Sequence, residues 1–129
     1  MKLYKELLSL AKNAMKNAYC PYSKFRVGAA VLTAGGNIYT GVNVENSSYG
    51  LTICAERSAI AKAVAEGERE ITAVAIAASS GKPVPPCGAC LQVISEFGKN
   101  PDIVTASGRG SLRIIKLRKL LPAAFKLLK

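Results

Sequence analysis

Arg26-Val27-Gly28-Ala29-Ala30-Val31-Leu32-Thr33 is a nearly unbroken run of apolar and small residues. Such a run is typical of a strand that is buried on both faces of a sheet. The turn residues Ala34-Gly35-Gly36-Asn37 follow it and lead into a second strand pattern over 38–45. The two segments are therefore predicted to pair as a hairpin.

Helical patterns lie on both sides of this hairpin. Leucine and alanine recur at helical spacing from Leu3 to Ala18, and an alanine-rich helix is expected from Cys54 to Glu66, before Gly67. The order α-β-β-α-β-α-β-β predicts a mixed sheet with helices packed on its faces. The remaining predictions are a buried strand over 71–78, a helix over 87–97, short strands over 102–106 and 112–117, and a last turn or two of helix after Pro122 that contains Phe125.

Length and composition favour one globular domain over residues 1–129, because the chain has 129 residues, 50% of them hydrophobic and 20% charged. No apolar run approaches the roughly 18 residues of a membrane span. Charge interrupts the first residues too often for a signal peptide, so we expect a cytoplasmic protein. The chain has no histidine. That excludes Ser-His-Asp triads, histidine metal ligands and imidazole general bases.

The charge is strongly basic, with 18 Lys and Arg against 8 Asp and Glu and a net charge of +10. Seven of these basic residues fall in the segment 109–129, which contains no acid. Such a basic C-terminal tail suits a nucleic-acid or polyanion partner, which is a possible partner but not the favoured one. Solvated lysines on a surface helix are the commoner explanation.

The cysteines suggest a metal centre. Cys87 and Cys90 form a Cys-x-x-Cys pair directly after Pro85-Pro86, and two thiolates at this spacing can face one metal ion. A thioredoxin-like redox pair and a structural zinc knuckle share the motif. Cys54 also precedes a helix, although a cysteine there can equally be a small buried apolar residue. Three thiolates without a fourth ligand describe a catalytic zinc that keeps one position for water.

Two charged residues follow Cys54. Both Cys54 and Glu56 can approach a point just beyond the N-terminal end of their helix, although a carboxylate there also simply suits the helix dipole. Arg57 can donate hydrogen bonds to sulfur and offset the charge of −1 that three thiolates and one Zn²⁺ leave.

These residues resemble a known family. Cys54-Ala55-Glu56-Arg57, followed by Pro86-Cys87-Gly88-Ala89-Cys90, is similar to the signature of the zinc nucleoside and nucleobase deaminases. The segments 21–30, 41–46 and 120–125 resemble the short, homotetrameric, zinc-dependent cytidine deaminases, so the likeness runs from about Ala18 to Phe125. It implies an α/β fold, a three-layer α-β-α sandwich around a mixed sheet of about five strands.

The resemblance also implies an activity and a site. The family hydrolyses cytidine and deoxycytidine to uridine and deoxyuridine plus ammonia for pyrimidine salvage, with a zinc-bound hydroxide that attacks C4 of cytosine. Glu56 matches the family's proton shuttle. Three cysteines match the ligands of the zinc ion, of which the family binds one per subunit. The metal ligands and substrate contacts implied are Cys54, Cys87 and Cys90 for zinc, with Phe25, Asn43, Glu45 and Ala55 for the nucleoside, and Tyr49 and Phe125 for a site in a neighbouring subunit of a homotetramer.

Some of these assignments have simpler alternatives. Residues two apart on a strand point to one face, so Asn43 and Glu45 can bind a sugar hydroxyl together or form a solvated strand edge. Phe25 can stack on the pyrimidine or pack in the core. Leu91 follows Cys90 where the family usually has arginine, so an enzyme of this sequence relies more heavily on Arg57.

Other functions remain open. The same zinc chemistry suits a nucleoside antibiotic such as blasticidin S or a base within RNA or DNA. The pair Asn43 and Glu45 favours a free nucleoside, whose sugar hydroxyls are not blocked. A zinc-stabilised RNA-binding module lacks a visible fourth ligand, and a thiol redox protein would use Cys87 and Cys90 without metal.

Overall fold

The strands form one mixed sheet. A computed structural model of the chain describes residues 2–106 and 111–127. The strand order is β2-β1-β3-β4-β5, and within it only β3 and β4 pair in parallel. The strands are β1 (Val27–Thr33), β2 (Ile38–Val42), β3 (Ile71–Ala78), β4 (Asp102–Ala106) and β5 (Leu112–Lys116). The predicted hairpin is confirmed by the β1–β2 pairing.

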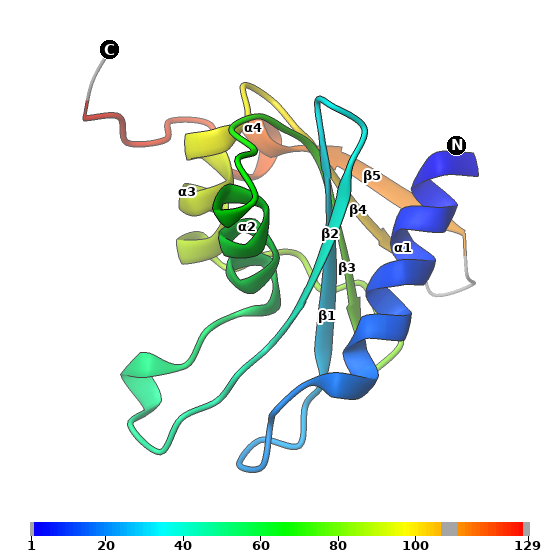
Figure 1. Cartoon of the computed structure of the whole chain (residues 1–129), viewed down its shortest axis with the longest axis vertical. Coiled ribbons are helices and arrows are strands. Elements are labelled where there is room, and N and C mark those ends of the chain that lie inside the picture. The colour runs from blue at the N-terminus through cyan, green and yellow to red at the C-terminus, as the bar shows by residue number, and fades with distance from the viewer. Residues whose placement is uncertain (1, 107–110, 128–129) are drawn as a thin grey trace.

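Helices cover both faces of the sheet, as predicted. Helix α1 (Lys2–Ala14) lies on one face, while α2 (Ala55–Ala65) and α3 (Gly88–Phe97) lie on the other (Figure 1). A short α4 (Leu117–Leu120) follows β5. The arrangement is a three-layer α-β-α sandwich. In the part of the chain that the structure describes, no helix has the length and hydropathy of a membrane span.

Two hydrophobic cores explain why β1 is apolar along its whole length. Ala29 and Val31 pack into the core beneath α2 and α3, whereas Ala30 and Leu32 pack into the core beneath α1. All four side chains are buried, because successive side chains of a strand point to opposite faces and both faces are covered.

Two glycines let helices lie directly on the main chain of the sheet. A Cβ atom on Gly28 would stand 2.1 Å from the backbone oxygen of Ala11 in α1. A Cβ atom on Gly41 would stand 2.3 Å from the backbone nitrogen of Ala59 in α2. Since real Cβ atoms do not approach backbone atoms so closely, any side chain at either position would push a helix away.

Two predicted ends of elements are wrong by more than one residue. The first helix ends at Ala14 and continues as a 3₁₀ turn, Met15–Asn17. Strand β2 ends at Val42, so Asn43 and Glu45 follow the strand instead of lying on it. The end is caused by Asn43, whose side-chain oxygen accepts a hydrogen bond from the backbone nitrogen of Val27 (3.0 Å) where the ladder would continue.

The C-terminal segment also differs from its prediction. The helix lies before Pro122, as α4, and residues 121–127 form turns and irregular structure. Proline restricts the residue before it to extended conformations and so ends the helix. Of the predicted basic tail, 109–110 and 128–129 lie outside the described residues, and with them Arg109 and Lys129.

Candidate active site

Three cysteine thiols meet at one end of the sheet. The Sγ atoms of Cys54, Cys87 and Cys90 all lie within 4.8 Å of one another, and the Sγ atoms of Cys87 and Cys90 are 3.6 Å apart. Cys54 immediately precedes α2 and Cys87 immediately precedes α3, while Cys90 lies in the first turn of α3. The N-termini of both helices point to this end (Figure 1).

Two helix N-termini give the cluster a positive environment. The first backbone N–H groups of a helix lack partners within it and favour anionic sulfur. Burial acts to raise the pKa of the Cys87 thiol, but hydrogen bonds, first from the backbone N–H of Cys90, outweigh it and lower that pKa. Three thiolates fit a zinc ion and leave its fourth position open.

The Glu56 carboxyl lies beside the thiols. Glu56 is the second residue of α2, is only 5% exposed, and lines the same cavity as Cys54 and Cys87. Burial raises its pKa above the ordinary value, and the nearby charge of Arg57 only partly opposes this. A buried carboxyl in this place can serve as a general acid or a general base.

The Arg57 guanidinium also borders the cluster. Its Nη2 donates to the backbone oxygen of Thr52 (3.3 Å) and to Cys54 Sγ (3.7 Å). Its Nε is buried and has no hydrogen-bond partner within residues 2–106 and 111–127. Leu91, which stands where the family usually has arginine, is 7% exposed and packs in the core beneath α2 and α3.

A cavity of about 220 Å³ opens beside the thiols and Glu56. Ala55 and Asn43 line it, and its walls are mostly apolar, formed by Val27, Thr52, Ile53, Ile76, Val84 and Pro85. Of the residues implied as substrate contacts, only Asn43 and Ala55 line this cavity within one chain.

The Asn43 amide is tied to the start of β1. Its Nδ2 donates to the backbone oxygen of Phe25 (2.8 Å), and its Oδ1 accepts from the backbone nitrogen of Val27 (3.0 Å). Asn43 is 9% exposed. The simpler alternative of a solvated strand edge is therefore wrong for Asn43.

The Glu45 carboxylate is also held by the loop before β1. Its Oε1 accepts from the backbone nitrogens of Tyr22 (3.0 Å) and Ser23 (3.2 Å), and its Oε2 accepts from the Ser23 hydroxyl. The Ser23 hydrogen bond is the main reason that the pKa of Glu45 is lowered. Glu45 is 6% exposed, so it is not a solvated edge residue either. The sequence did not predict Ser23 as a hydrogen-bond partner of Glu45, although Ser23 lies in the segment 21–30 that carries the resemblance.

The other implied aromatic contacts lie on the surface. Phe25 is 37% exposed, so the alternative that it packs in the core is wrong. Tyr49 and Phe125 are 71% and 70% exposed. The backbone oxygen of Phe125 accepts from Gln92 Nε2 (3.0 Å), which holds the C-terminal segment against α3.

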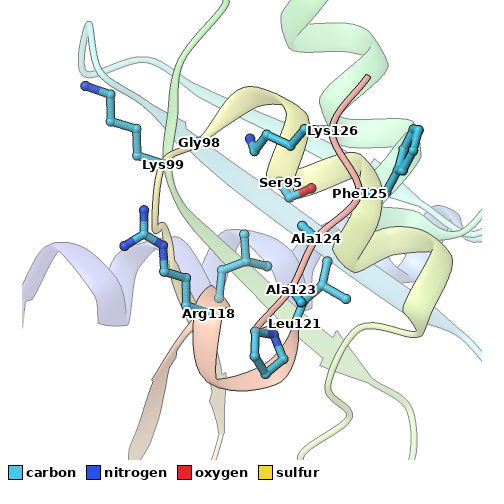
Figure 2. Close-up of a pocket in the computed structure, with 11 residues that line it drawn as sticks. Ser95, Gly98, Lys99, Arg118, Leu121, Ala123, Ala124, Phe125 and Lys126 are labelled. Atoms are coloured by element: carbon cyan, nitrogen blue, oxygen red, sulfur yellow. The ribbon is translucent and has the colours of Figure 1, made fainter. Parts of the chain in front are cut away.

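A larger cavity of about 670 Å³ lies between α3, α4 and the C-terminal segment. Figure 2 shows Phe125 on one side of that segment and the side chains of Lys99 and Arg118 on the other. No thiol or carboxylate lines this cavity among the described residues. The thiols of Cys54 and Cys87 and the Glu56 carboxyl line the smaller cavity instead.

Comparison with known proteins agrees with this geometry. Residues 1–107 match the family described as the cytidine and deoxycytidylate deaminase zinc-binding region. A curated cytidine deaminase of Halalkalibacterium halodurans is 46% identical over 92% of this chain and 91% of its own length. One from Sporosarcina psychrophila is 49% identical over 93% and 89%. A crystal structure of cytidine deaminase from Burkholderia pseudomallei superposes with a TM-score of 0.86 at 45% identity, covering 93% of this chain and 97% of that one. The match of the family model and the identity with these relatives show that this chain belongs to the cytidine and deoxycytidylate deaminase family.

Proposed function

We propose that this protein is a cytidine deaminase that hydrolyses cytidine and deoxycytidine to uridine and deoxyuridine plus ammonia. One observation carries the proposal: three thiols lie within 4.8 Å of one another, and two of them, Cys54 and Cys87, line one cavity together with the buried Glu56. Relatives named as cytidine deaminases, at 46% and 49% identity over most of their length, support the same substrate.

The metal site fits zinc. Cys54, Cys87 and Cys90 would hold the ion from the N-termini of α2 and α3, and Arg57 would offset the excess thiolate charge through Cys54 Sγ. When bound, zinc lowers the pKa of a coordinated water to about 7 and so supplies a nucleophile at neutral pH.

The Glu56 carboxylate moves the protons. It accepts the proton that the attacking water loses and donates it to N3 of cytosine, and a further transfer reaches the amine that leaves C4 as ammonia. Its burial suits this task, because burial raises its pKa above the ordinary value and so favours the protonated form that donates to N3.

The substrate is a free nucleoside. Ala55 contacts the base with its backbone, Phe25 stacks on the pyrimidine, and Asn43 with Glu45 bind the sugar. A carboxylate accepts hydrogen bonds only, so Glu45 requires a hydroxyl donor from the ligand. Since a polynucleotide esterifies the 3′ and 5′ hydroxyls, a contact to one of these favours salvage of nucleosides over editing of RNA or DNA.

The assembly is a homotetramer in the cytoplasm. Tyr49 and Phe125 are strongly exposed within one chain, although large aromatic side chains tend to be covered. In the tetramer each would reach the active site of a neighbouring subunit. We also propose that residues 1–129 form a single domain.

The test is the ultraviolet absorbance of cytidine incubated with purified protein of known zinc content. We expect the wild type to convert cytidine to uridine, and Glu56→Gln to lower kcat by at least about 10²-fold at unchanged zinc. The matched control is Glu66→Gln, because Glu66 is an exposed carboxylate at the other end of the same helix and its loss should leave kcat unchanged.

Absence of turnover by a zinc-loaded wild type would reject cytidine as the substrate. Turnover of blasticidin S or of a single-stranded polynucleotide by the same preparation would then assign the same chemistry to a different amino-pyrimidine.

A further inference from the structure

The loop before β1 is organised around the Ser23 hydroxyl. This hydroxyl donates to Glu45 Oε2 and accepts from the backbone nitrogen of Phe25 (3.0 Å). It therefore joins two residues to which the proposed function gives different tasks, Glu45 at the sugar and Phe25 at the base. A hydroxyl is needed for this, because only a group that both donates and accepts can make the two hydrogen bonds.

The same loop is held in a backbone conformation that side chains disfavour. Lys24, between Ser23 and Phe25, has φ of +61° and is the one non-glycine residue with positive φ in the described part of the chain. Its backbone nitrogen donates to the oxygen of Cys20 (3.0 Å). Such a conformation persists only where the surrounding contacts impose it, and such conformations cluster at ligand-binding sites.

Glu45 supplies those surrounding contacts. The carboxylate accepts from the backbone nitrogens of Tyr22 and Ser23 and from the Ser23 hydroxyl. A carboxylate has about four acceptor positions, so three hydrogen bonds leave about one for a ligand hydroxyl. The loop therefore fixes the direction in which Glu45 can receive a ligand.

We propose that Ser23 is a positioning residue for the nucleoside: its hydroxyl orients the Glu45 carboxylate toward a sugar hydroxyl. This inference rests on the proposed function, since it takes Glu45 as the sugar contact. The role is specific to the sugar, because Ser23 lines neither the thiol cluster nor the cavity beside Glu56.

The test compares two substrates that differ only in the sugar. Cytidine has the ring hydroxyls, and 2′,3′-dideoxycytidine lacks both of them. Kinetic constants for each are measured with the wild type, Ser23→Ala, Ser23→Thr and the control Ser79→Ala. The control is matched because the Ser79 hydroxyl accepts from the neighbouring Arg26 backbone nitrogen (3.1 Å) but does not touch Glu45.

We expect Ser23→Ala to raise KM for cytidine roughly tenfold, as loss of a hydrogen bond to a charged group does, with kcat changed less than about twofold. On 2′,3′-dideoxycytidine its KM should equal that of the wild type, because this substrate has no ring hydroxyl to reach Glu45. Ser23→Thr keeps the hydroxyl and should restore KM, and Ser79→Ala should change neither constant.

Zinc content and the midpoint of thermal unfolding are measured on each variant. If Ser23→Ala does not fold, Ser23→Cys gives the same comparison with a side chain of similar size and a weak donor. An equal KM penalty on both substrates, or an unchanged KM for cytidine, would overturn the proposal while leaving cytidine deamination in place. A wild type that turns over neither substrate would instead overturn the proposed function and this inference with it.

Discussion

At the scale of single residues, Arg57 is the cation that borders the thiol cluster. Its Nη2 lies 3.7 Å from Cys54 Sγ, and the position after Cys90 is occupied by the buried, uncharged Leu91. A hydrogen bond to a metal ligand tunes that ligand's charge and orientation. The zinc affinity of this chain should therefore depend strongly on one guanidinium.

Arg57→Gln is accordingly expected to weaken zinc binding by about 10- to 100-fold. Competition with a coloured zinc chelator measures this directly. Arg69→Gln is the matched control, because Arg69 is exposed and its guanidinium donates to the backbone oxygens of Val64 and Glu68. Equal zinc affinity of the two variants would contradict a role for Arg57 at the metal.

Residue types predicted the metal site better than the sugar site. Few side chains provide thiolate ligands, so Cys54, Cys87 and Cys90 could be grouped from their chemistry before any geometry was known. The hydrogen bond of Ser23 to Glu45 could not be predicted from residue types. This hydrogen bond joins positions 22 residues apart, and it forms because β2 ends at Val42 and Glu45 turns toward the loop.

At the scale of elements, two polar contacts of Asp102 join three of them. The Tyr4 hydroxyl of α1 donates to Asp102 Oδ2 at the start of β4 (2.7 Å), and Lys116 Nζ of β5 lies 2.9 Å from Asp102 Oδ1. Burial, followed by the hydrogen bond to Asp102, raises the pKa of Tyr4 to about 12. The ordinary value is 10.0, so the folded chain holds this proton more tightly than the unfolded chain does.

Stability should therefore depend on pH in the alkaline range. The contribution of the Tyr4 hydroxyl is complete below about pH 10 and is lost as the pH rises toward about 12. The difference in the free energy of unfolding between the wild type and Tyr4→Phe should be constant below pH 10 and fall above it. Urea unfolding at a series of pH values measures this, and parallel pH profiles would contradict it.

Elements were predictable where both faces of a segment are covered. The bounds of β3 and β4 agree with the sequence prediction, because apolar runs that are buried on both sides leave little freedom. The predictions for the end of β2 and for the C-terminal helix were wrong. A hydrogen bond to the side chain of Asn43 ends β2, and Pro122 ends the helix. A hydrogen bond between a side chain and a distant backbone group leaves no periodic pattern in the sequence.

At the scale of the whole molecule, the charge and the assembly are the open properties. The net charge of +10 has no single cause in the structure, although Lys116 of the predicted basic tail pairs with Asp102. That the chain is one domain with a basic tail over 109–129 stays a prediction. The tetramer, in contrast, has a direct test.

If Phe125 completes a neighbouring site, two inactive variants should restore each other. Subunits of Glu56→Gln and Phe125→Ala, unfolded together and refolded, should regain about a quarter of wild-type activity, because half of the chains keep Glu56 and half of their neighbours supply Phe125. The control mixes Glu56→Gln with Cys87→Ser, whose defects lie in the same cavity of one chain. Full activity of Phe125→Ala alone, or no gain on mixing, would contradict the shared site.

The contact of Gly41 with α2 has a consequence for how such a site can change over time. Helix α2 rests on the main chain of β2 at Gly41, and its first turn carries Glu56. The distance of the Glu56 carboxyl from the sheet is thus set by main-chain atoms and by glycine at a single position. The side chains at Val27, Ile53 and Val84, which wall the cavity, are free of that constraint. New substrate preferences can therefore be selected through the walls while the proton-transfer distance is inherited unchanged.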